Sequence, residues 1–362
     1  MAVEQRLLLG CDRCTRVSEA FSSHGVVYLW FPLGHTMGKV VSALNEQGIP
    51  CDVDRGAGYI GVNLDQSSPE LLVRSIEPTL TSREMQDSRA LHMPNGGEPK
   101  LADVGRTLAL GEFIELSRAD LLRGILLEER LTSHFQPIVS VANPAEIYAH
   151  EALLRGVDTD GTLISPGVLF QQARDGGLLF QLDLAARRSA ILNAVKHDIA
   201  SRLFVNFSPA AIYDPVYCLR TTVSAVREGN LDRDRVVFEV IESDKTDDPE
   251  HLVSILEHYR AAGFRVALDD VGAGYGSLNM LHRLRPDYMK LDMDLIRNVD
   301  SDSYKSMIAG KLLEMANELR VTSVVEGVET QGELDWARQH GADYAQGYFF
   351  ARPAPEPRTS LE

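Results

Sequence analysis

The chain has 362 residues, of which 44% are hydrophobic, and a formal net charge of −16. This length suits a barrel of about 250 residues joined to a smaller domain of about 100. The acidic balance disfavours binding of a long nucleic acid, whose partners normally carry a basic excess. With no apolar stretch of about 18 residues and no signal-peptide pattern, we expect a cytoplasmic protein without membrane insertion. Four cysteines in a chain of this length do not indicate a disulfide framework.

The first hundred residues have the pattern of a small α+β domain. Residues 26–31 form an apolar run typical of a buried strand, and residues 59–64 predict a second strand. A helix is expected over about 39–46, and Ser68-Pro69 is a typical start for another. The chain then becomes polar from 82 to 100, which favours a domain boundary there. The expected division is a domain over 1–100, a linker over 101–117 and a second domain over 118–358.

The second segment predicts a β/α barrel. An amphipathic helix from about residue 118 leads into it. Strands over 136–141 and 147–154 follow with a connection too short for a crossover helix, so they should be antiparallel. Strand and helix then alternate, which predicts a TIM-like (β/α)8 barrel with one reversed strand. The other six strands are expected at 203–208, 236–242, 265–271, 288–292, 322–327 and 344–350.

Polar side chains recur in or at the end of these strands. The set is Glu151, Asn206, Glu239, Glu242, Asp269, Asp270, Lys290, Glu326 and Gln346. Charged groups in apolar strands are costly unless paired or metal-bound, and strand ends of such a barrel meet at one mouth. Carboxylates so close repel one another unless a cation lies between them. Oxygen ligands without cysteine or histidine suit Mg²⁺ or Mn²⁺, and the pair Asp269-Asp270 suits two ions that support phosphoryl chemistry.

Other interpretations exist for single members of this set. Any one acid could be a solvated strand end or half of a barrel salt bridge. Lys290 could neutralise an acid, or could orient the attacking water and stabilise negative charge. Arg155 could form a surface salt bridge, or present its planar fork to a phosphate. A glycosidase with two carboxylates explains neither Lys290, nor Asn206, nor the adjacent aspartates.

Several motifs in order carry a family resemblance. They are FQPI at 135–138, EALLR at 151–155, NFSP at 206–209, EVIE at 239–242, DDVGAGY at 269–275, KLD at 290–292, EGVET at 326–330 and QGY at 346–348. Residues 118–355 thereby resemble the EAL domain family of bacterial cyclic di-GMP phosphodiesterases. The resemblance implies hydrolysis of cyclic di-GMP to linear pGpG, with two Mg²⁺ or Mn²⁺ ions per site, and a homodimer formed through the barrel.

The resemblance also implies roles for individual residues. The implied metal ligands are Glu151, Asn206, Glu239, Asp269 and Asp270, with Glu151 also catalytic. Lys290 and Glu326 would act on the attacking water, Glu326 as ligand or as base, and Gln346 would support the water network and the substrate. Gln136, Leu153 and Arg155 would hold the substrate.

In this family the loop over 270–277 lies near the dimer interface. The resemblance implies that Glu242 braces this loop, which contains Gly272, Gly274 and Tyr275. The family usually has Phe where this chain has Val271, and often Thr and Ser at Ala273 and Gly276. No ligand is lost, so we expect activity, whereas regulation through the loop does not follow from the sequence. The alternative is a catalytically silent receptor, although such receptors typically lose metal ligands.

Three sequence motifs of the first domain give weaker functional signals. Cys11 and Cys14 form half of a zinc or redox pattern, which Cys51 with His24 or His35 could complete only through folding; inert thiols are the alternative. Residues 56–61 match GxGxxG but lead into a strand, and residues 34–39 are one residue short of a P-loop. We reject both as nucleotide sites. A sensory or regulatory role for this domain rests on architecture alone.

Overall fold

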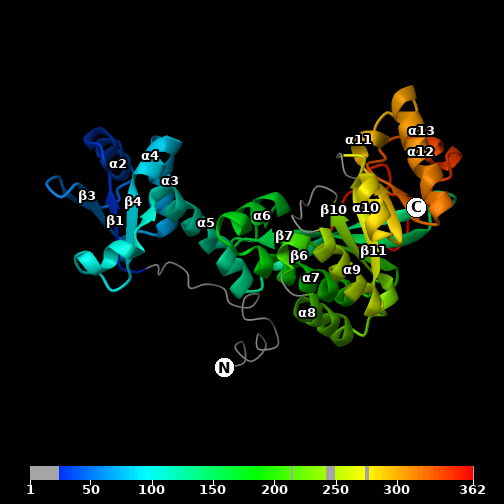
Figure 1. The fold of residues 1–362 in the computed structure, drawn as a ribbon, viewed down its shortest axis with the longest axis horizontal. Coiled ribbons are helices and arrows are strands. Elements are labelled where there is room, and N and C mark those ends of the chain that lie inside the picture. Colours follow the sequence, from blue (N-terminus) through cyan, green and yellow to red (C-terminus); the bar gives the residue numbers. More distant parts are fainter. Residues whose placement is uncertain (1–23, 213–214, 242–248, 274–276, 362) are drawn as a thin grey trace. The chain divides into compact units, whose positions relative to one another are not determined.

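The computed structural model describes residues 24–212, 215–241, 249–273 and 277–361. Contacts divide the chain into two compact units, which we treat separately. The N-terminal unit contains residues up to 128 together with 167–179, and the barrel unit contains 129–166 and 180–361 (Figure 1). Cys11 and Cys14 lie outside the described residues. No helix that the structure describes is both long enough and apolar enough to cross a bilayer.

The N-terminal unit is an antiparallel sheet packed against helices. Its strand order is β2-β3-β1-β4-β5. Alternate residues of β1, such as Val27 and Leu29, are fully buried in one core with Leu44 and Leu72 from the helices. The strands are β1 (Val26–Trp30), β2 (Cys51–Asp54), β3 (Tyr59–Asn63), β4 (Arg89–Met93) and β5 (Leu108–Ala109). The helices are α2 (Gly34–Glu46), α3 (Pro69–Ile76), α4 (Ser82–Asp87), α5 (Leu110–Leu127) and α6 (Pro166–Asp175), with 3₁₀ turns at Leu64–Gln66, Glu77–Thr79 and Leu101–Arg106.

Helix starts in this unit follow their local sequence. The Ser68 hydroxyl accepts a hydrogen bond from the Leu71 amide at 3.1 Å, which confirms the expected cap of α3. Thr81 and Glu84 form a reciprocal capping box at α4. The Glu84 carboxylate also accepts hydrogen bonds from Thr36 and Lys39 of α2, so one side chain joins two helices.

The stretches that we expected to hold the domain boundary and the linker contain regular secondary structure. The polar stretch 82–100 contains α4 and β4, and β4 pairs with the central strand β1. The expected linker 101–117 contains β5 and the first half of α5, with Phe113 and Ile114 buried in the N-terminal core. The pairing of β4 with β1 and the packing of α5 into this core are tertiary contacts that the local sequence does not show. The domain bounds 1–100 and 118–358 stay predictions.

The barrel unit confirms the expected TIM-like topology with one reversed strand. Among the described residues, eight strands close in the order β6-β14-β13-β12-β11-β10-β9-β7, and β6 pairs with β7 to complete the ring. β6 is antiparallel to both of its neighbours. The strands are β6 (Leu131–Ser140), β7 (Ile147–Val157), β9 (Arg202–Asn206), β10 (Val236–Ile241), β11 (Arg265–Val271), β12 (Tyr288–Leu291), β13 (Thr322–Val325) and β14 (Tyr344–Ala345), with β8 (Leu163–Ile164) paired to β7 outside the ring.

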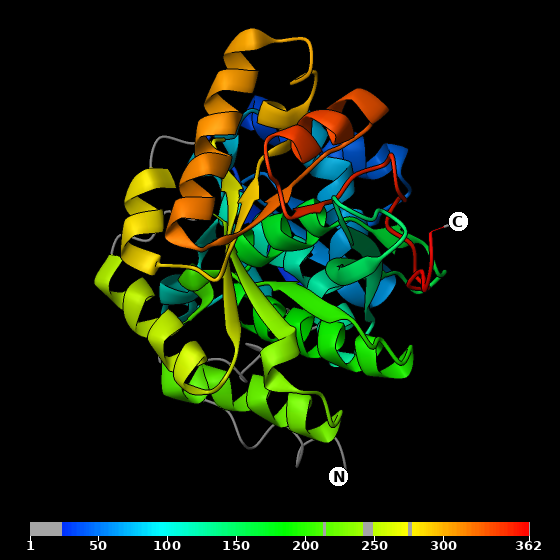
Figure 2. The same cartoon turned by 90° about the vertical axis from the view of Figure 1, so that its right-hand side faces the viewer.

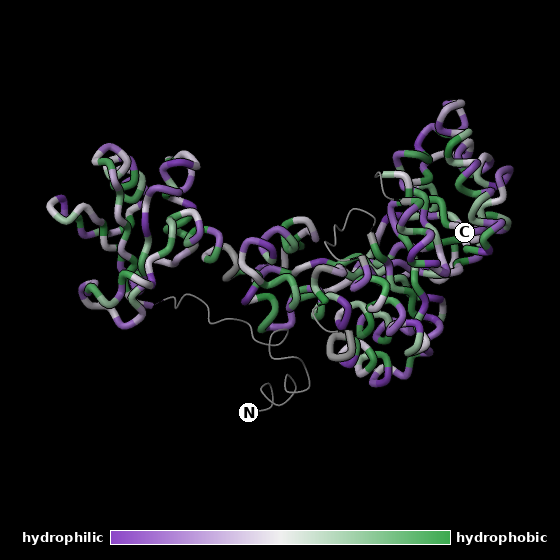
Figure 3. The backbone as a smooth tube through the Cα atoms, in the orientation of Figure 1, coloured by the Kyte–Doolittle hydropathy of each residue, from purple (hydrophilic) through white to green (hydrophobic). Residues whose placement is uncertain are grey.

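Helices lie around the outside of these strands (Figure 2). They are α7 (Leu179–Lys196), α8 (Pro215–Glu228), α9 (Pro249–Ala261), α10 (Ser277–Leu284), α11 (Met293–Ile296), α12 (Ser303–Leu319) and α13 (Gln331–Gln339), with 3₁₀ turns at Pro209–Ala211 and Arg233–Arg235. Hydrophobic and hydrophilic segments alternate along the backbone, and many of the outer turns are hydrophilic (Figure 3).

The last strand is shorter than the sequence predicts. We expected it over 344–350, but it ends at Ala345. Gly347 lies so close to Val328 that a Cβ there would be 2.1 Å from the Val328 carbonyl oxygen. The chain then turns, and the Phe349 amide donates to that carbonyl at 3.0 Å. This close backbone approach directs the chain away from the barrel wall.

We predict that the N-terminal unit loses stability as the pH falls from about 4.5 towards 2. Hydrogen bonds from Lys39, then Thr81, then Thr36 lower the pKa of Glu84 to about 2 from its ordinary 4.5. The depressed pKa means that this contribution is present above the ordinary value and disappears as the folded carboxylate is protonated. Glu84→Gln should lower the Tm at neutral pH and flatten the acid dependence. Trp30 fluorescence in a Trp336→Phe background reports this unit, and an unchanged pH profile in Glu84→Gln would contradict the prediction.

Candidate metal centre at the barrel mouth

The site is built on an apolar layer inside the barrel. Seven buried residues form this layer: Ile138, Ala149, Phe204, Val237, Ala267, Tyr288 and Val324. Side chains two positions apart on a strand point to the same face, so the next inward residue on each strand lies one layer further along. These next residues are Gln136, Glu151, Asn206, Glu239, Asp269, Lys290 and Glu326. The alternation of the strands therefore places a polar layer on an apolar floor.

Lys290 is the centre of the polar layer. Its Nζ lies 2.6 Å from Glu239 Oε1, 2.6 Å from Glu326 Oε1 and 3.1 Å from Asp269 Oδ1. Glu151 Oε2 is 3.7 Å away. The Lys290 side chain is 1% exposed and Glu239 is fully buried. One ammonium therefore faces four carboxylates with little access to water.

The pKa values reflect this crowding. Burial raises the pKa of Glu239 and of Glu326 well above the ordinary value, against the opposing effect of Lys290. Burial and the neighbouring Asp269 raise the pKa of Asp270 to about 6. Burial acts to lower the pKa of Lys290, but the surrounding carboxylates outweigh it and raise that pKa. One lysine does not offset four ionised carboxylates, so further positive charge would favour their ionised forms.

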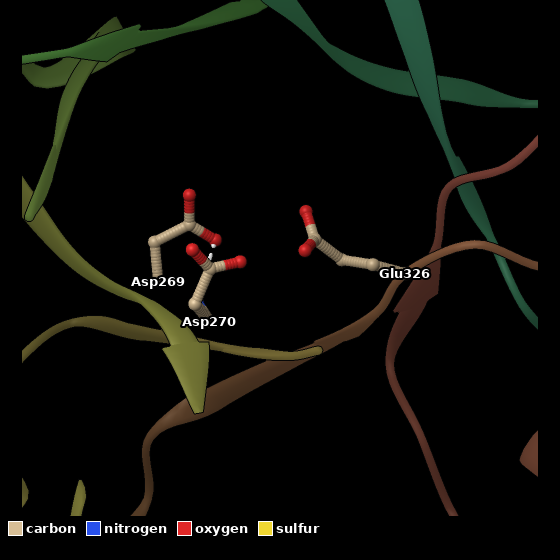
Figure 4. Close-up of side chains that lie close together, drawn as sticks. All are labelled: Asp269, Asp270 and Glu326. Carbon is tan, nitrogen blue, oxygen red and sulfur yellow. Dashed lines mark hydrogen bonds between the residues drawn. The ribbon is translucent and has the colours of Figure 1, made fainter. Parts of the chain in front are cut away.

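Asp269, Asp270 and Glu326 form a group with the spacing of metal ligands, in which Asp269 is buried and the other two are half-buried. Each offers a carboxylate oxygen, and these oxygens lie within 4.8 Å of one another. Figure 4 shows the three carboxylates turned towards a common space, the two aspartates from β11 and Glu326 from the end of β13. Asp270 has φ of 55°, which a non-glycine residue rarely adopts, and its amide donates to Asp269 Oδ1 at 3.0 Å. This backbone turn places adjacent carboxylates at one edge of the space.

These residues fit a hard divalent cation. The donors are carboxylate and amide oxygens, the type that Mg²⁺ and Mn²⁺ prefer. Among the described residues, Glu239 Oε2 is buried without a hydrogen-bond partner, while Oε1 lies 2.6 Å from Lys290 Nζ. Gln346 Oε1 is also buried without a partner in this part of the chain. Buried acceptors in this state are favourable positions for a cation or for its water.

Two amide side chains orient the Glu151 carboxylate. Asn206 Nδ2 donates to Glu151 Oε1 at 2.9 Å, and Gln346 Nε2 donates to Glu151 Oε2 at 2.7 Å. Gln346 Nε2 also lies 3.0 Å from Gln136 Oε1, and Gln136 Nε2 donates to the Ala351 carbonyl at 3.1 Å. Glu151 is thus fixed from both sides, and the segment after β14 holds Gln136.

A cavity of about 310 Å³ opens over these residues. Of the predicted substrate residues, Gln136 and Gln346 line it, whereas Leu153 and Arg155 do not. Leu153 and Arg155 share the inward face of β7 with Glu151 and lie further along the strand, outside the lining. Seven residues of the wall have no role in the sequence analysis, and they are Asp292, Met293, Arg297, Gly327, Glu329, Gly347 and Tyr348. Only Arg297 lacked a signal, since the other six lie within three residues of a predicted site residue.

Two glycines hold the loops around the cavity close to α11. A Cβ on Gly327 would lie 2.4 Å from Met293 Cβ, and one on Gly272 would lie 2.2 Å from Leu295 Cδ1. Both glycines have positive φ, so a side chain would add backbone strain. The other residues assigned to loop regulation, which are Glu242, Gly274 and Tyr275, lie outside the described residues, as does Gly276.

This fold and site define a TIM-like barrel protein with one reversed strand and a candidate divalent-metal centre at its strand ends. Residues 118–353 match the EAL domain, and the chain belongs to the EAL domain family.

Known proteins resemble this chain over the barrel and beyond it. The protein named probable cyclic di-GMP phosphodiesterase PdeB of Escherichia coli is 32% identical over 62% of this chain and 42% of its own length. An uncharacterized protein of Azorhizobium caulinodans is 30% identical over 92% of this chain and 45% of its own length. A standalone EAL protein of Vibrio cholerae, solved in its c-di-GMP-bound form, is 34% identical with a TM-score of 0.58, over 64% of this chain and 95% of that chain. The chain spans less than half the length of these two curated relatives.

We predict that Lys290→Met lowers the free energy of unfolding by about 3–5 kcal/mol, because it leaves buried carboxylates without their counter-charge. Added Mg²⁺ or Mn²⁺ should restore part of this loss by supplying positive charge. Guanidinium unfolding of the full chain, with and without the ion, measures both effects.

Lys311→Met is the matched control, since Lys311 is 74% exposed and pairs with Glu314 on the same helix. Its effect should stay within about 0.5 kcal/mol. Equal free energies of unfolding for the two variants would show that Lys290 does not neutralise the buried carboxylates.

Proposed function

We propose that the barrel unit hydrolyses cyclic di-GMP to the linear dinucleotide pGpG. The observation that supports this most is the buried Lys290 among Glu151, Glu239, Asp269 and Glu326, beside the cavity. Such a cluster suits chemistry in which negative charge increases at a phosphate. The named activity of the PdeB relative and the ligand of the Vibrio cholerae structure support cyclic di-GMP as the substrate.

The residues suited to hold two ions, Mg²⁺ or Mn²⁺, are Glu151, Asn206, Glu239, Asp269 and Asp270. Ions of this kind supply Lewis-acid activation of a water and of a phosphate oxygen. Glu151 is kept in one orientation by Asn206 and Gln346, so its carboxylate needs little rearrangement on loading. This preorganisation favours binding because less side-chain entropy is lost.

The reaction breaks one of the two phosphodiester linkages. The oxygen of a water bonds to phosphorus, the bond from phosphorus to the 3′ oxygen breaks, and that oxygen leaves with a proton. Lys290 stabilises the negative charge that develops on the phosphate. Glu326 faces the same space as the aspartates, where it serves as a further ligand or receives the proton of the water.

Residues around the mouth would hold the dinucleotide. Gln136 lines the cavity and is anchored to the Ala351 carbonyl. Arg155 extends beyond Glu151 on the inward face of β7, where its guanidinium suits the second phosphate. Leu153, which lies between Glu151 and Arg155 on the same face, would supply an apolar contact to the dinucleotide. We further propose a homodimer through the barrel, near the loop over 270–277, with the N-terminal unit regulating activity.

Product analysis tests this proposal directly. Chelator-treated protein should leave cyclic di-GMP intact, and added Mg²⁺ or Mn²⁺ should restore formation of pGpG, which chromatography separates from the substrate. Hydrolysis at the untreated rate after chelation would refute the metal requirement. Tight binding of cyclic di-GMP without product in the presence of either ion would instead identify a silent receptor.

Asp269→Ala should lower kcat by about 10³-fold or more, because it removes several kcal/mol of transition-state stabilisation. The variant should stay folded, with a Tm close to that of the original chain, since the substitution also removes a buried charge. Asp294→Ala is a matched control, an exposed aspartate on α11, and should keep the kcat of the original chain. Comparable turnover in Asp269→Ala would exclude the assigned role of Asp269.

A further inference from the structure

A buried ion pair outside the mouth has no part in the proposed chemistry. Asp183 and Arg187, one turn apart on α7, are each 1% exposed. Arg187 Nε lies 2.9 Å and its second terminal nitrogen 2.7 Å from the same oxygen, Asp183 Oδ2. The pair is completely enclosed by the surrounding helices and strands.

Two further helices hold the arginine in place. Its other terminal nitrogen donates to the Thr222 hydroxyl of α8 at 2.8 Å and to the Tyr259 hydroxyl of α9 at 2.8 Å. Both partners are buried, with exposed fractions of 1% or less. Arg187 therefore has a single position, and it fixes the orientation of Asp183.

The second carboxylate oxygen of Asp183 binds the turn that follows the strand of Asn206. Asp183 Oδ1 accepts a hydrogen bond from the Ser208 amide at 2.8 Å, two residues after Asn206. Between them, Phe207 stacks on the ring of Tyr259, with ring centroids 5.4 Å apart and planes at 17°. The Phe207 amide donates to the Glu239 carbonyl at 3.1 Å. The turn after Asn206 is thus held by the neighbouring strand and by the network around Arg187.

Stability alone is a weak reason for such a pair. Removing two charges from water is costly, and well-packed apolar side chains in their place are often at least as stable. What an apolar pair cannot do is accept the Ser208 hydrogen bond and set the direction of the turn. The network therefore has a geometric consequence that its stability contribution does not explain.

We propose that Asp183 and Arg187 are positioning residues that fix the Asn206 side chain for metal binding. This inference rests on the proposed function, in which Asn206 is a metal ligand. Partners of this kind typically change metal affinity by about 10- to 100-fold when they are replaced. The predicted effect is therefore on ion affinity, and a merely structural pair would not produce it.

The test is manganese binding to the full chain, measured by titration calorimetry without substrate, and the Tm of each variant. The double variant Asp183→Leu with Arg187→Met removes both charges at similar volume. We expect a Tm close to that of the original chain and a Kd for Mn²⁺ raised by about tenfold or more. Arg187→Lys keeps the charge but loses the planar fork, and should raise the Kd by a smaller factor. This milder variant keeps the test possible if the double variant does not fold.

Ile191→Ala is the matched control, a fully buried residue one turn further along α7. It should lower the Tm and leave the Kd unchanged. The inference is overturned when the folded double variant, or Arg187→Lys alone, binds manganese as the original chain does, or when Ile191→Ala weakens binding equally. If the original chain binds no manganese, the proposed metal centre is refuted, and this inference is refuted with it.

Discussion

The barrel mouth depends on the balance of charge around one buried ammonium. Lys290 is in contact with Glu239, Glu326 and Asp269 within 3.1 Å, and further acids lie on either side. In a site with little water these carboxylates repel strongly, and burial together with the charge of Asp269 raises the pKa of Asp270 to about 6. One lysine cannot neutralise the set. The same repulsion among the acids therefore favours divalent cations, so the cost of assembling the acids is linked to ion binding.

The fold meets this constraint with a rigid support. Tyr288 and Lys290 occupy the same face of β12, as do Phe204 and Asn206 on β9, so the apolar layer packs directly beneath the charges. That layer excludes water from below and leaves the mouth as the route to solvent. Around it, Gly327 allows α11 to approach the end of β13 within contact distance. Helix packing on the outside thus determines how precisely the ligands lie on the inside.

The regular alternation of side chains along the strands explains which features could be predicted from the sequence. The barrel, its reversed strand and the convergence of Glu239, Asp269 and Lys290 all follow from strand periodicity and from where each strand ends. Features set by tertiary contacts could not be predicted in this way. The turn at Gly347 depends on its closeness to Val328, and the burial of Phe113 depends on a sheet formed by distant residues. Leu153 and Arg155 lie on the expected face, but the depth of the cavity is not a local property.

The departures from the family pattern at Val271 and Ala273 leave the ligand positions intact for a physical reason. Val271 is 1% exposed, and its carbonyl accepts the Asp292 amide at 3.2 Å, while the Asp270 carbonyl accepts the Ala273 amide at 3.1 Å. These bonds belong to the backbone and do not depend on which side chain stands at 271 or 273. A smaller residue at 271 reduces packing towards the outer helices, whereas Asp269 and Asp270 are directed by the strand and by the turn. Side-chain changes at 271 and 273 therefore leave the backbone that directs Asp269 and Asp270 unchanged.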